Sequence, residues 1–251
     1  MTTEHCLVLR LAGPLQSWGS HSRFNRRDTD AEPTKSGIVG LLAAAQGRRR
    51  TDPIEDLIGL TLGIRTDRPG TLLRDYHTVS DLRGRPLLSA AVTGKGAQKP
   101  TSPAKATHVT TRFYLQDAVF VAAVGGPGEL LHALRDALRR PAFPLALGRR
   151  SCVPTQPLVL DPPADELWPG EVTTVLAAVP WQAGTRAEVR LPVTIDDRAG
   201  DDLRSDVPST FDPLRRSFAT RSVSHGWVTV TDPAAEPAPT TEHDPFALLG
   251  W

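Results

Sequence analysis

The sequence predicts an α+β fold, and three observations support this prediction. The chain has 251 residues, of which 39% are hydrophobic and 23% charged, a composition typical of a globular protein with a core of its own. Short runs of aliphatic, β-branched and aromatic residues recur along the chain, as expected for strands. Between them lie stretches with the spacing and caps of helices. Strands and helices alternate in the first half, and strand candidates dominate the second.

The first predicted elements are a strand and two helices. Aliphatic residues run together over 6–12 and stop at Gly13-Pro14, which indicates a buried strand followed by a turn. The stretch "IVGLLAAA" at 38–45 is predicted as a helix that begins at the cap Thr34 or Ser36 and ends at Gly47. A short helix follows Pro53, through residues 56–60.

The next predicted elements complete a βαββαβ order. β-Branched and aromatic residues predict strands at 72–79 and 108–114, the second continuing through 117–124. Leucines on one face predict an amphipathic helix at 129–140, and a fourth strand is expected near 143–147. This order is ferredoxin-like, with two helices on one face of an antiparallel sheet. The other face stays open, as in RNA-recognition modules (RRM), and residues 1–160 form this domain.

A long insertion lies between the two central strands. Residues 80–107 are rich in Gly, Pro, Ser and Thr, and they carry five basic residues against one acidic residue. The segment is too long for a hairpin turn, so it is either a functional projection or a disordered insertion. Its positive charge favours the projection.

Residues 161–251 form a second predicted unit, a smaller β-rich domain. Strand candidates at 171–179, 186–193 and 222–230 are separated by Pro/Gly segments and by the acidic stretch 196–206. The tail 231–251 contains several prolines and no Lys or Arg. We expect it to be extended or flexible until something binds it.

Charge is divided unevenly along the chain. Residues 1–150 hold 22 Lys and Arg against 13 Asp and Glu, whereas residues 151–251 hold 7 against 15. A basic half beside an acidic half favours a polyanion on one side and another partner, such as a protein, on the other.

Metal, disulfide and membrane classes are not indicated. Cys6 and Cys152 form no C-x-x-C pair and lie near no His cluster, so we expect no metal and no cofactor. The first apolar run contains Arg10 and is too short for a signal peptide or a membrane span. We expect a cytoplasmic protein without a membrane partner.

The start of the helix at 38–45 is a candidate anion site. Lys35, Ser36 and Gly37 lie where free backbone N–H groups and the helix dipole attract phosphate. The Walker A spacing is absent, so the alternative is an ordinary cap with a solvated lysine. Trp18, in the preceding loop, either stacks on a base or packs under the loop.

Two arginine clusters are further candidates. Arg23, Arg26 and Arg27 alternate with an aromatic and an amide residue, which suits single-stranded nucleic acid through phosphate pairing and stacking. Arg149 and Arg150, beside Ser151, are either a second phosphate clamp or a solvated turn.

Tyr76 and His77 are the candidates for catalysis. With Lys99, Lys105 or His108 nearby, they could support metal-free RNA cleavage, in which a general base takes the 2′-OH proton and a cation stabilises the phosphorane. Adjacent residues of a strand face opposite ways, so the two side chains reach one site only across a bulge. We therefore favour binding over catalysis.

Four motifs, in order, carry a family resemblance: "LVLRLAGPLQSWG", "PTKSGIVGLLAAAQG", "LRDYHTV" and "LGRRSC". Together they resemble the CasD family, the RAMP-type subunit of the type I-E CRISPR Cascade complex. The resemblance is clear over residues 7–154 and weaker beyond.

The resemblance implies a RAMP domain whose thumb corresponds to residues 80–107. It implies a subunit that binds the 5′ handle of CRISPR RNA, caps the filament of backbone subunits through the thumb, and contacts the large subunit that recognises target DNA. RNA processing belongs to another subunit of this subtype, so the chain is expected to bind RNA without cutting it. A related subtype's counterpart does cleave, which leaves metal-independent processing of CRISPR repeat RNA as the alternative. The residues expected to contact RNA are Gln16, Trp18, Arg23, Arg26, Arg27, Lys35, Ser36, Gly37, His77, Lys95, Lys99, Lys105, His108, Arg112, Arg149, Arg150 and Ser151.

Overall fold

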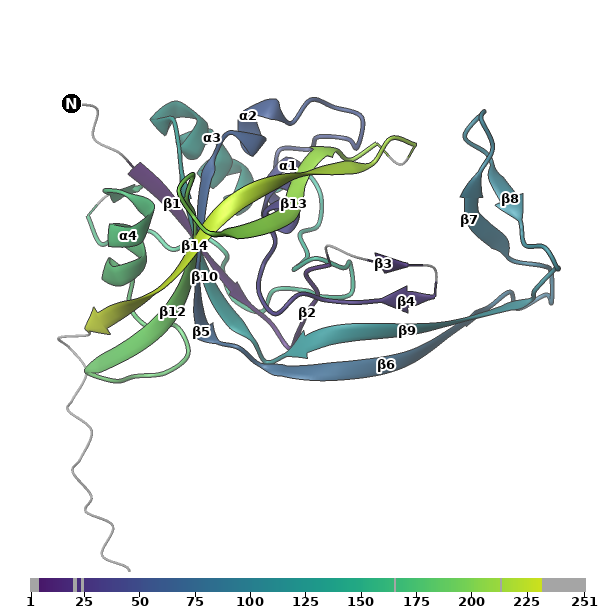
Figure 1. Cartoon of the computed structure of the whole chain (residues 1–251), viewed down its shortest axis with the longest axis horizontal. Helices are drawn as coiled ribbons and strands as arrows, with labels where there is room; N and C mark the ends of the chain where they lie inside the picture. Colours follow the sequence, from purple (N-terminus) through teal and green to yellow (C-terminus); the bar gives the residue numbers. More distant parts are fainter. Residues whose placement is uncertain (1–4, 20–21, 24, 165, 213, 232–251) are drawn as a thin grey trace, which may run out of the picture.

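Two main β-sheets, one in a body and one in a projecting arm, organise the molecule (Figure 1). The computed structural model describes residues 5–19, 22–23, 25–164, 166–212 and 214–231, and it is a mixed α/β structure in which strands predominate. The body holds a seven-stranded sheet, whose strands in spatial order are β11 (Trp168–Pro169), β1 (His5–Ala12), β10 (Val119–Gly125), β5 (Thr61–Arg68), β12 (Glu188–Asp196), β14 (Ser217–Thr231) and β13 (Asp202–Thr210).

The central strands of the body sheet, β1, β10 and β5, are buried on both faces. In β1, alternate residues enter two different cores: Leu7, Leu9 and Leu11 contribute to one, and Cys6 and Val8 to the other. The first core lies under α1 (Lys35–Ala45) and α3 (Gly128–Arg139), and the short α2 (Glu55–Ile58) adds to it. The second core lies under α4 (Val172–Ala178). Apolar runs without a polar alternate are typical of strands covered on both sides.

The expected open sheet face is therefore wrong. Val172, Val175 and Leu176 of α4 are buried in this second core, and α4 contacts β10, β5 and β14 on the face where an RNA-binding surface was predicted. The segment 171–179 was predicted as a strand, but its apolar residues recur at helical spacing and form α4. Arg65 of β5, with no exposed side chain, donates to the carbonyls of Leu176 and Val179 and so holds the C-terminal end of this helix.

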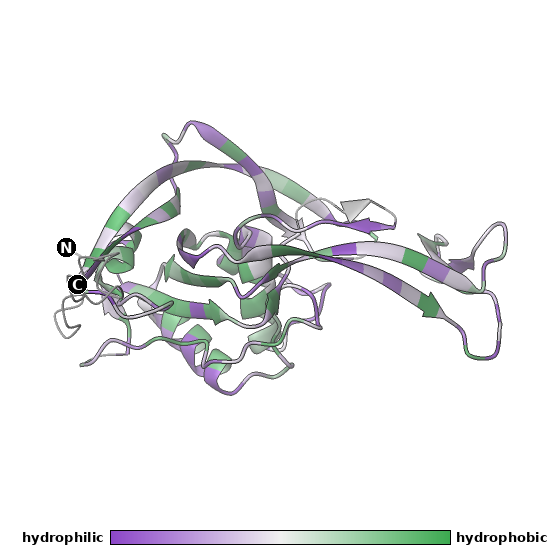
Figure 2. Cartoon of the chain, turned by 90° about the horizontal axis from the view of Figure 1, so that it is seen from below, coloured by the Kyte–Doolittle hydropathy of each residue, from purple (hydrophilic) through white to green (hydrophobic). Residues whose placement is uncertain are grey.

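One long hairpin connects the body to the arm. Strands β5 and β10 pair within the body, and the same two chain segments continue as β6 (Thr71–Ser80) and β9 (Thr107–Gln116), which pair in the second sheet. The direction changes at Gly70 and Asp117, which both have positive φ. We call Thr71–Gln116 the arm; it extends away from the body, as Figures 1 and 2 show.

The predicted central strands are therefore assigned to the wrong sheet. Residues 72–79 and 108–114 do form strands, but they lie in the arm, and the central strand at Thr61–Arg68 was missed. The continuation predicted at 117–124 is confirmed as β10 of the body sheet. The inserted segment forms the tip of the arm, with β7 (Leu88–Val92) paired to β8 (Gln98–Pro100). The second sheet is completed by β2 (Leu15–Gln16), β3 (Ser22–Arg23) and β4 (Arg26–Arg27).

The remaining predictions divide by element. The helices at 38–45, 56–60 and 129–140 are confirmed as α1, α2 and α3, and the strands at 186–193 and 222–230 as β12 and β14. The fourth strand near 143–147 is wrong: this segment has no regular secondary structure, and β11 holds the position beside β1. The stretch 196–206 was predicted as a connection but contains the start of β13.

The second half of the chain joins the body sheet. Strand β12 pairs with β5 through Val193, Thr194 and Ile195, so the sheet is continuous across residue 160. The division into domains at 1–160 and 161–251 stays a prediction. The tail beyond Thr231 lies outside the described residues.

Candidate nucleic-acid interface

The first turn of α1 is an anion site that the chain fills with its own carboxylate. The Lys35 N–H donates to the Asp206 carboxylate at 2.7 Å, and the Gly37 N–H donates to the side-chain oxygen of the cap Thr34 at 3.2 Å. The Ser36 hydroxyl is buried, 3.2 Å from that of Thr34. A helix N-terminus favours negative charge. The predicted electrostatics are present, but the bound anion is Asp206, not a phosphate.

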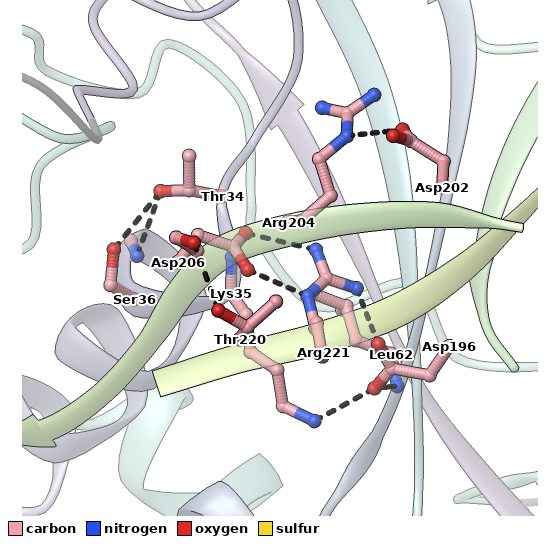
Figure 3. A network of polar contacts seen from close by, with 12 residues as sticks. Thr34, Lys35, Ser36, Leu62, Asp196, Asp202, Arg204, Asp206, Thr220 and Arg221 are labelled. Atoms are coloured by element: carbon pink, nitrogen blue, oxygen red, sulfur yellow. Dashed lines mark hydrogen bonds and ion pairs between the residues drawn. The ribbon is translucent and has the colours of Figure 1, made fainter. Parts of the chain in front are cut away.

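A buried charge cluster, defined by Lys35, Asp196, Asp206 and Arg221, joins α1 to the C-terminal strands (Figure 3). The Lys35 ammonium, on a side chain only 10% exposed, lies 2.7 Å from Asp196 and donates to the Leu60 carbonyl at 2.9 Å. Arg221 donates twice to Asp206, at 2.7 and 2.9 Å, and pairs with Asp196. Burial lowers the pKa of Arg221, but the two carboxylates outweigh burial and raise the pKa above its ordinary value. Lys35 is thus committed inside the protein.

Gln16 and Trp18 also lie in the interior. The Gln16 amide donates to the carbonyls of Leu11 at 2.9 Å and Ala118 at 2.7 Å, and its oxygen accepts from the Trp18 indole at 3.0 Å. Trp18 is 1% exposed, and a Cβ at Gly37 would lie 2.6 Å from its ring. The alternative that Trp18 packs under the loop is confirmed. Neither side chain is placed to touch RNA.

Arg149 links two strands through hydrogen bonds. Its guanidinium donates to the backbone carbonyls of Phe113, Arg27 and Asp28 at 2.9, 2.7 and 3.1 Å. The same group lies 4.8 Å from the centre of the Tyr114 ring. Arg149 therefore holds β4 against β9, and most of its donors are used by the fold.

One face of the second sheet forms a groove of about 340 Å³. We call it the arm groove; it is lined by Asn25, Arg26, Arg74, Tyr76, Val109, Thr111 and Phe113.

The arm groove combines cations with rings. Strand register places Arg74 opposite Phe113 and Tyr76 opposite Thr111, all on one face of the sheet. The Arg26 guanidinium lies 4.7 Å from the centre of the Phe113 ring, and Tyr76 is 67% exposed. The side chain of Arg74 makes no hydrogen bond or ion pair with another described residue. The lining itself contains no carboxylate, but the Arg26 guanidinium is paired with the Asp28 carboxylate at 2.8 Å. Arg74 is therefore the groove cation without a carboxylate partner among the described residues.

The opposite face of the arm carries a different set. His77 lies 3.5 Å from Asp75 on the same strand, and the register places Arg112 opposite Asp75 and His108 opposite Val79. The β6–β9 register runs without a bulge. Tyr76 and His77 therefore face opposite ways, as predicted, and His77, His108 and Arg112 lie behind the groove.

The other predicted residues are spread over the surface. Lys95, Lys99 and Lys105 are exposed at the tip of the arm, and Arg150 and Ser151 are exposed in the turn before Cys152. Arg27 is half-buried in β4, while the side chain of Arg23 lies outside what the structure describes. Of the candidate residues whose side chains the structure describes, only Arg26 and Tyr76 line one common groove.

Two central groove residues were missed from the sequence. Arg74 lies two positions before Tyr76, so strand alternation alone places both on one face. Phe113 reaches the groove through the register between β6 and β9, which no local pattern contains.

Among the described residues, no group of three His, Cys, Asp or Glu side chains is placed to hold a metal ion. None of the helices in the same ranges is long and apolar enough to cross a membrane.

Comparison with known proteins gives consistent sequence matches. A family model described as "CRISPR-associated protein (Cas_Cas5)" matches residues 6–224. The "CRISPR system Cascade subunit CasD" of Escherichia coli (strain K12) is 36% identical over 169 residues, which cover 61% of this chain and 69% of that protein.

Solved structures match over most of the chain. One, described as "Crystal structure of Cas protein", is 36% identical, covers 91% of this chain and 99% of its own, and superposes with a TM-score of 0.68. Another, from a "CRISPR RNA-guided surveillance complex", is 37% identical, covers 93% and 95%, and has a TM-score of 0.72. The sequence match over residues 6–224 and the shared fold together show that the chain belongs to the CRISPR-associated Cas5 family, as a CasD-type subunit of the type I-E system.

Proposed function

We propose that this chain is a noncatalytic CRISPR RNA-binding subunit of a Cascade-type surveillance complex. In this role it holds the 5′ handle of the RNA, caps the filament of backbone subunits and contacts the large subunit. The names of its relatives supply the assembly, a Cascade and an RNA-guided surveillance complex. The observation that carries the proposal is the arm groove, whose lining joins two guanidinium groups to two aromatic rings.

The chemistry of the groove suits single-stranded RNA. Guanidinium groups pair with phosphate oxygens, and aromatic faces stack on unpaired bases. Arg74 supplies the first kind of contact, and Tyr76 supplies the second. Arg26, whose Nε is bound to Asp28, adds to the first kind only through its terminal N–H groups. Arg27, Arg150, Ser151 and the arm-tip lysines remain candidates for further contacts along the RNA, because their side chains reach the surface.

Binding without cleavage is favoured by the two faces of the arm. A general base must lie within hydrogen-bond reach of the 2′-OH whose phosphate a cation stabilises. The arm groove contains no His, Asp, Glu or Lys, and His77 lies on the other face beside Asp75. A metal-independent endoribonuclease centred on Tyr76 and His77 would need these two side chains to meet in one site.

We infer that the body contains a ferredoxin-like RAMP unit and that the arm is its thumb. The supporting observation is the spatial order β11-β1-β10-β5, with α1 between β1 and β5 and α3 between β10 and β11. The arm spans Thr71–Gln116, which is longer than the insertion predicted at 80–107. Its lysine-bearing tip is the part that we assign to the neighbouring backbone subunit and its stretch of RNA.

The two faces of β6 and β9 provide a matched test. The probe is a labelled single-stranded RNA with the CRISPR repeat sequence, titrated with Arg74→Ala, Tyr76→Ala, Arg112→Ala and His77→Ala. Loss of a stacked base costs about 1–3 kcal/mol, which is about 5- to 150-fold in affinity. We expect such losses for Arg74 and Tyr76 and less than about twofold for the opposite face. Equal losses on both faces, or a loss confined to Arg112 and His77, would rule out the groove.

A further inference from the structure

Strand β14 has one edge that is only partly paired. It is 15 residues long, and β12 pairs with it from Val223 to Thr231. On its other side, β13 pairs only between Ser217 and Val223. From residue 224 to residue 231 this second edge has no strand partner among the described residues, and Figure 1 shows the arrow of β14 continuing past β13.

The open edge borders apolar groups on both faces of the sheet. Val228 and Val230 face the core under α4, and Trp227, on the other face, is 59% exposed. The Arg190 guanidinium of β12 lies 5.2 Å from the centre of the Trp227 ring. An edge of this length, with an exposed tryptophan, is a template for strand addition that proteins normally cover.

The segment that follows β14 has a composition suited to covering this edge. Residues 232–245 contain four prolines and four acidic residues, without Lys or Arg, and the following six residues read "FALLGW". Large apolar side chains stand at both even and odd positions of these six residues: Phe246 and Leu248 on one side, Leu249 and Trp251 on the other. Apolar residues on both sides are typical of a strand that is buried on both faces.

The lengths are compatible with folding back. The eight edge residues span about 27 Å, since a strand rises about 3.4 Å per residue. Fourteen connecting residues reach about 46 Å when extended, which is enough to reverse direction and return along the strand.

We propose that residues 246–251 pair with the open edge of β14 as an additional antiparallel strand, covering Trp227 on one face and the Val228–Val230 core on the other. The occupant is the chain's own tail, because it begins where the open edge ends and has the required apolar pattern. The matched family model ends at residue 224, before the open edge and the tail. It is independent of RNA binding by the arm.

Hydrogen exchange at the edge tests the proposal. Amide exchange over residues 224–231 is measured by mass spectrometry in the full chain, in a chain ending at Thr231, and in Leu248→Asp/Leu249→Asp. The matched control, Thr240→Asp/Thr241→Asp, adds the same charge to the connection and keeps the apolar residues. We expect alternate edge amides to exchange about tenfold faster or more in the first two variants, but not in the control.

Three results would overturn the proposal. Equal exchange in the full and shortened chains would mean that the tail leaves the edge open. Protection that rises with protein concentration would assign the edge to a second copy of the chain. Protection that appears only in the assembled complex would assign it to a partner subunit. None of these results changes the expected RNA affinity, so the proposed function is tested independently by the RNA titration.

Discussion

Asp206 has two neighbours that depend on its charge. It accepts from the N–H of Lys35 at the start of α1 and from the guanidinium of Arg221, and its own side chain is 6% exposed. Removing one member of a buried ion pair leaves the other charge without compensation, which is far more costly than losing an exposed pair. The buried charge cluster thus ties the helix to the C-terminal strands.

We expect Asp206→Ala to lower the free energy of unfolding by about 3–5 kcal/mol, because Arg221 and the helix terminus both lose their partner. Asp136→Ala is the control. The Asp136 side chain, which pairs with Arg135, is 65% exposed, and exposed pairs contribute about 0–1 kcal/mol to the free energy of unfolding. Urea unfolding measures both. Equal effects would show that the cluster is not a structural tie.

Lys35 separates structure from RNA contact at a single residue. Because its ammonium is bound to Asp196 and to a backbone carbonyl, Lys35→Met should weaken folding while the folded protein keeps its RNA affinity within about twofold. The measurement is an RNA titration under conditions where both proteins are folded. A large loss of RNA affinity with unchanged stability would contradict this and indicate that Lys35 binds phosphate.

Acid sensitivity has an identifiable source at Asp202. Hydrogen bonds from His225 and Arg204 lower its pKa from 3.8 to about 2. A carboxyl whose pKa is lower in the folded state stabilises the protein above pH 3.8, and that contribution is lost as the pH falls toward 2. We expect the free energy of unfolding to decline below about pH 4, less steeply in Asp202→Asn. Urea unfolding at a series of pH values measures this, and stability that rises between pH 4 and 2 would contradict it.

At the scale of elements, the turn from body to arm depends on Gly70. Its φ is +72°, and a Cβ there would lie 2.4 Å from the carbonyl oxygen of Gln116 on the facing strand. Gly84 in the arm tip has a similar φ of +67° but nothing within 4 Å of an added Cβ. The two glycines thus share the backbone requirement and differ in the contact.

We expect Gly70→Ala to destabilise the protein more than Gly84→Ala. In both variants an alanine must adopt the left-handed backbone conformation, which lowers the free energy of unfolding by about 1–2 kcal/mol. Only Gly70→Ala also pushes β9 away from β6. Thermal unfolding compares the two, and the RNA titration reports whether the groove changes shape. If the two substitutions have equal effects, Gly70 is not the pivot.

The elements that could be predicted from the sequence are those with a local pattern. Helix α1 has a cap, an apolar run and a terminating glycine, and α3 has leucines at helical spacing. Strand β5 was missed because Gly63, Arg65 and Asp67 interrupt its apolar residues; Arg65 is buried only because it holds the end of α4.

The candidate site divides in the same way. Strand alternation correctly separates Tyr76 from His77, since it is a property of neighbouring residues. The burial of Trp18, Lys35 and Gln16 depends on Gly37, Asp196 and Ala118, which lie far away in sequence or in another element. Charge and aromatic content indicated a nucleic-acid interface, but only the strand register locates it on one face of the arm.

At the scale of the molecule, positive charge is concentrated in the arm. Residues 71–116 carry seven Lys and Arg against two Asp, and three acidic residues of the second half, Asp196, Asp202 and Asp206, are paired with arginines in the body. When the arm neutralises several phosphates of a bound RNA, the counterions of those phosphates are released. RNA affinity should therefore fall linearly with salt on logarithmic axes, with a slope of about −0.7 per phosphate contact. An affinity independent of salt would contradict this account of the arm.

The arm tip should be separable from the body. Ser80 faces Thr107 at the end of the β6–β9 ladder, so residues 81–106 can be replaced by an Asn-Gly turn without changing the register. We expect a folded protein with an unchanged unfolding midpoint that no longer joins the backbone subunits. Size-exclusion chromatography with the backbone subunits measures assembly. If this variant assembles normally, the tip is not the docking element.

The most direct test of the whole account is whether the bound RNA stays intact. Labelled CRISPR repeat RNA is incubated with an excess of the protein in EDTA, under single-turnover conditions, alongside folded His77→Ala. The account predicts a stable complex with uncut RNA for both proteins. Specific cleavage by the wild type that disappears in His77→Ala would contradict it and assign the protein to the metal-independent nucleases.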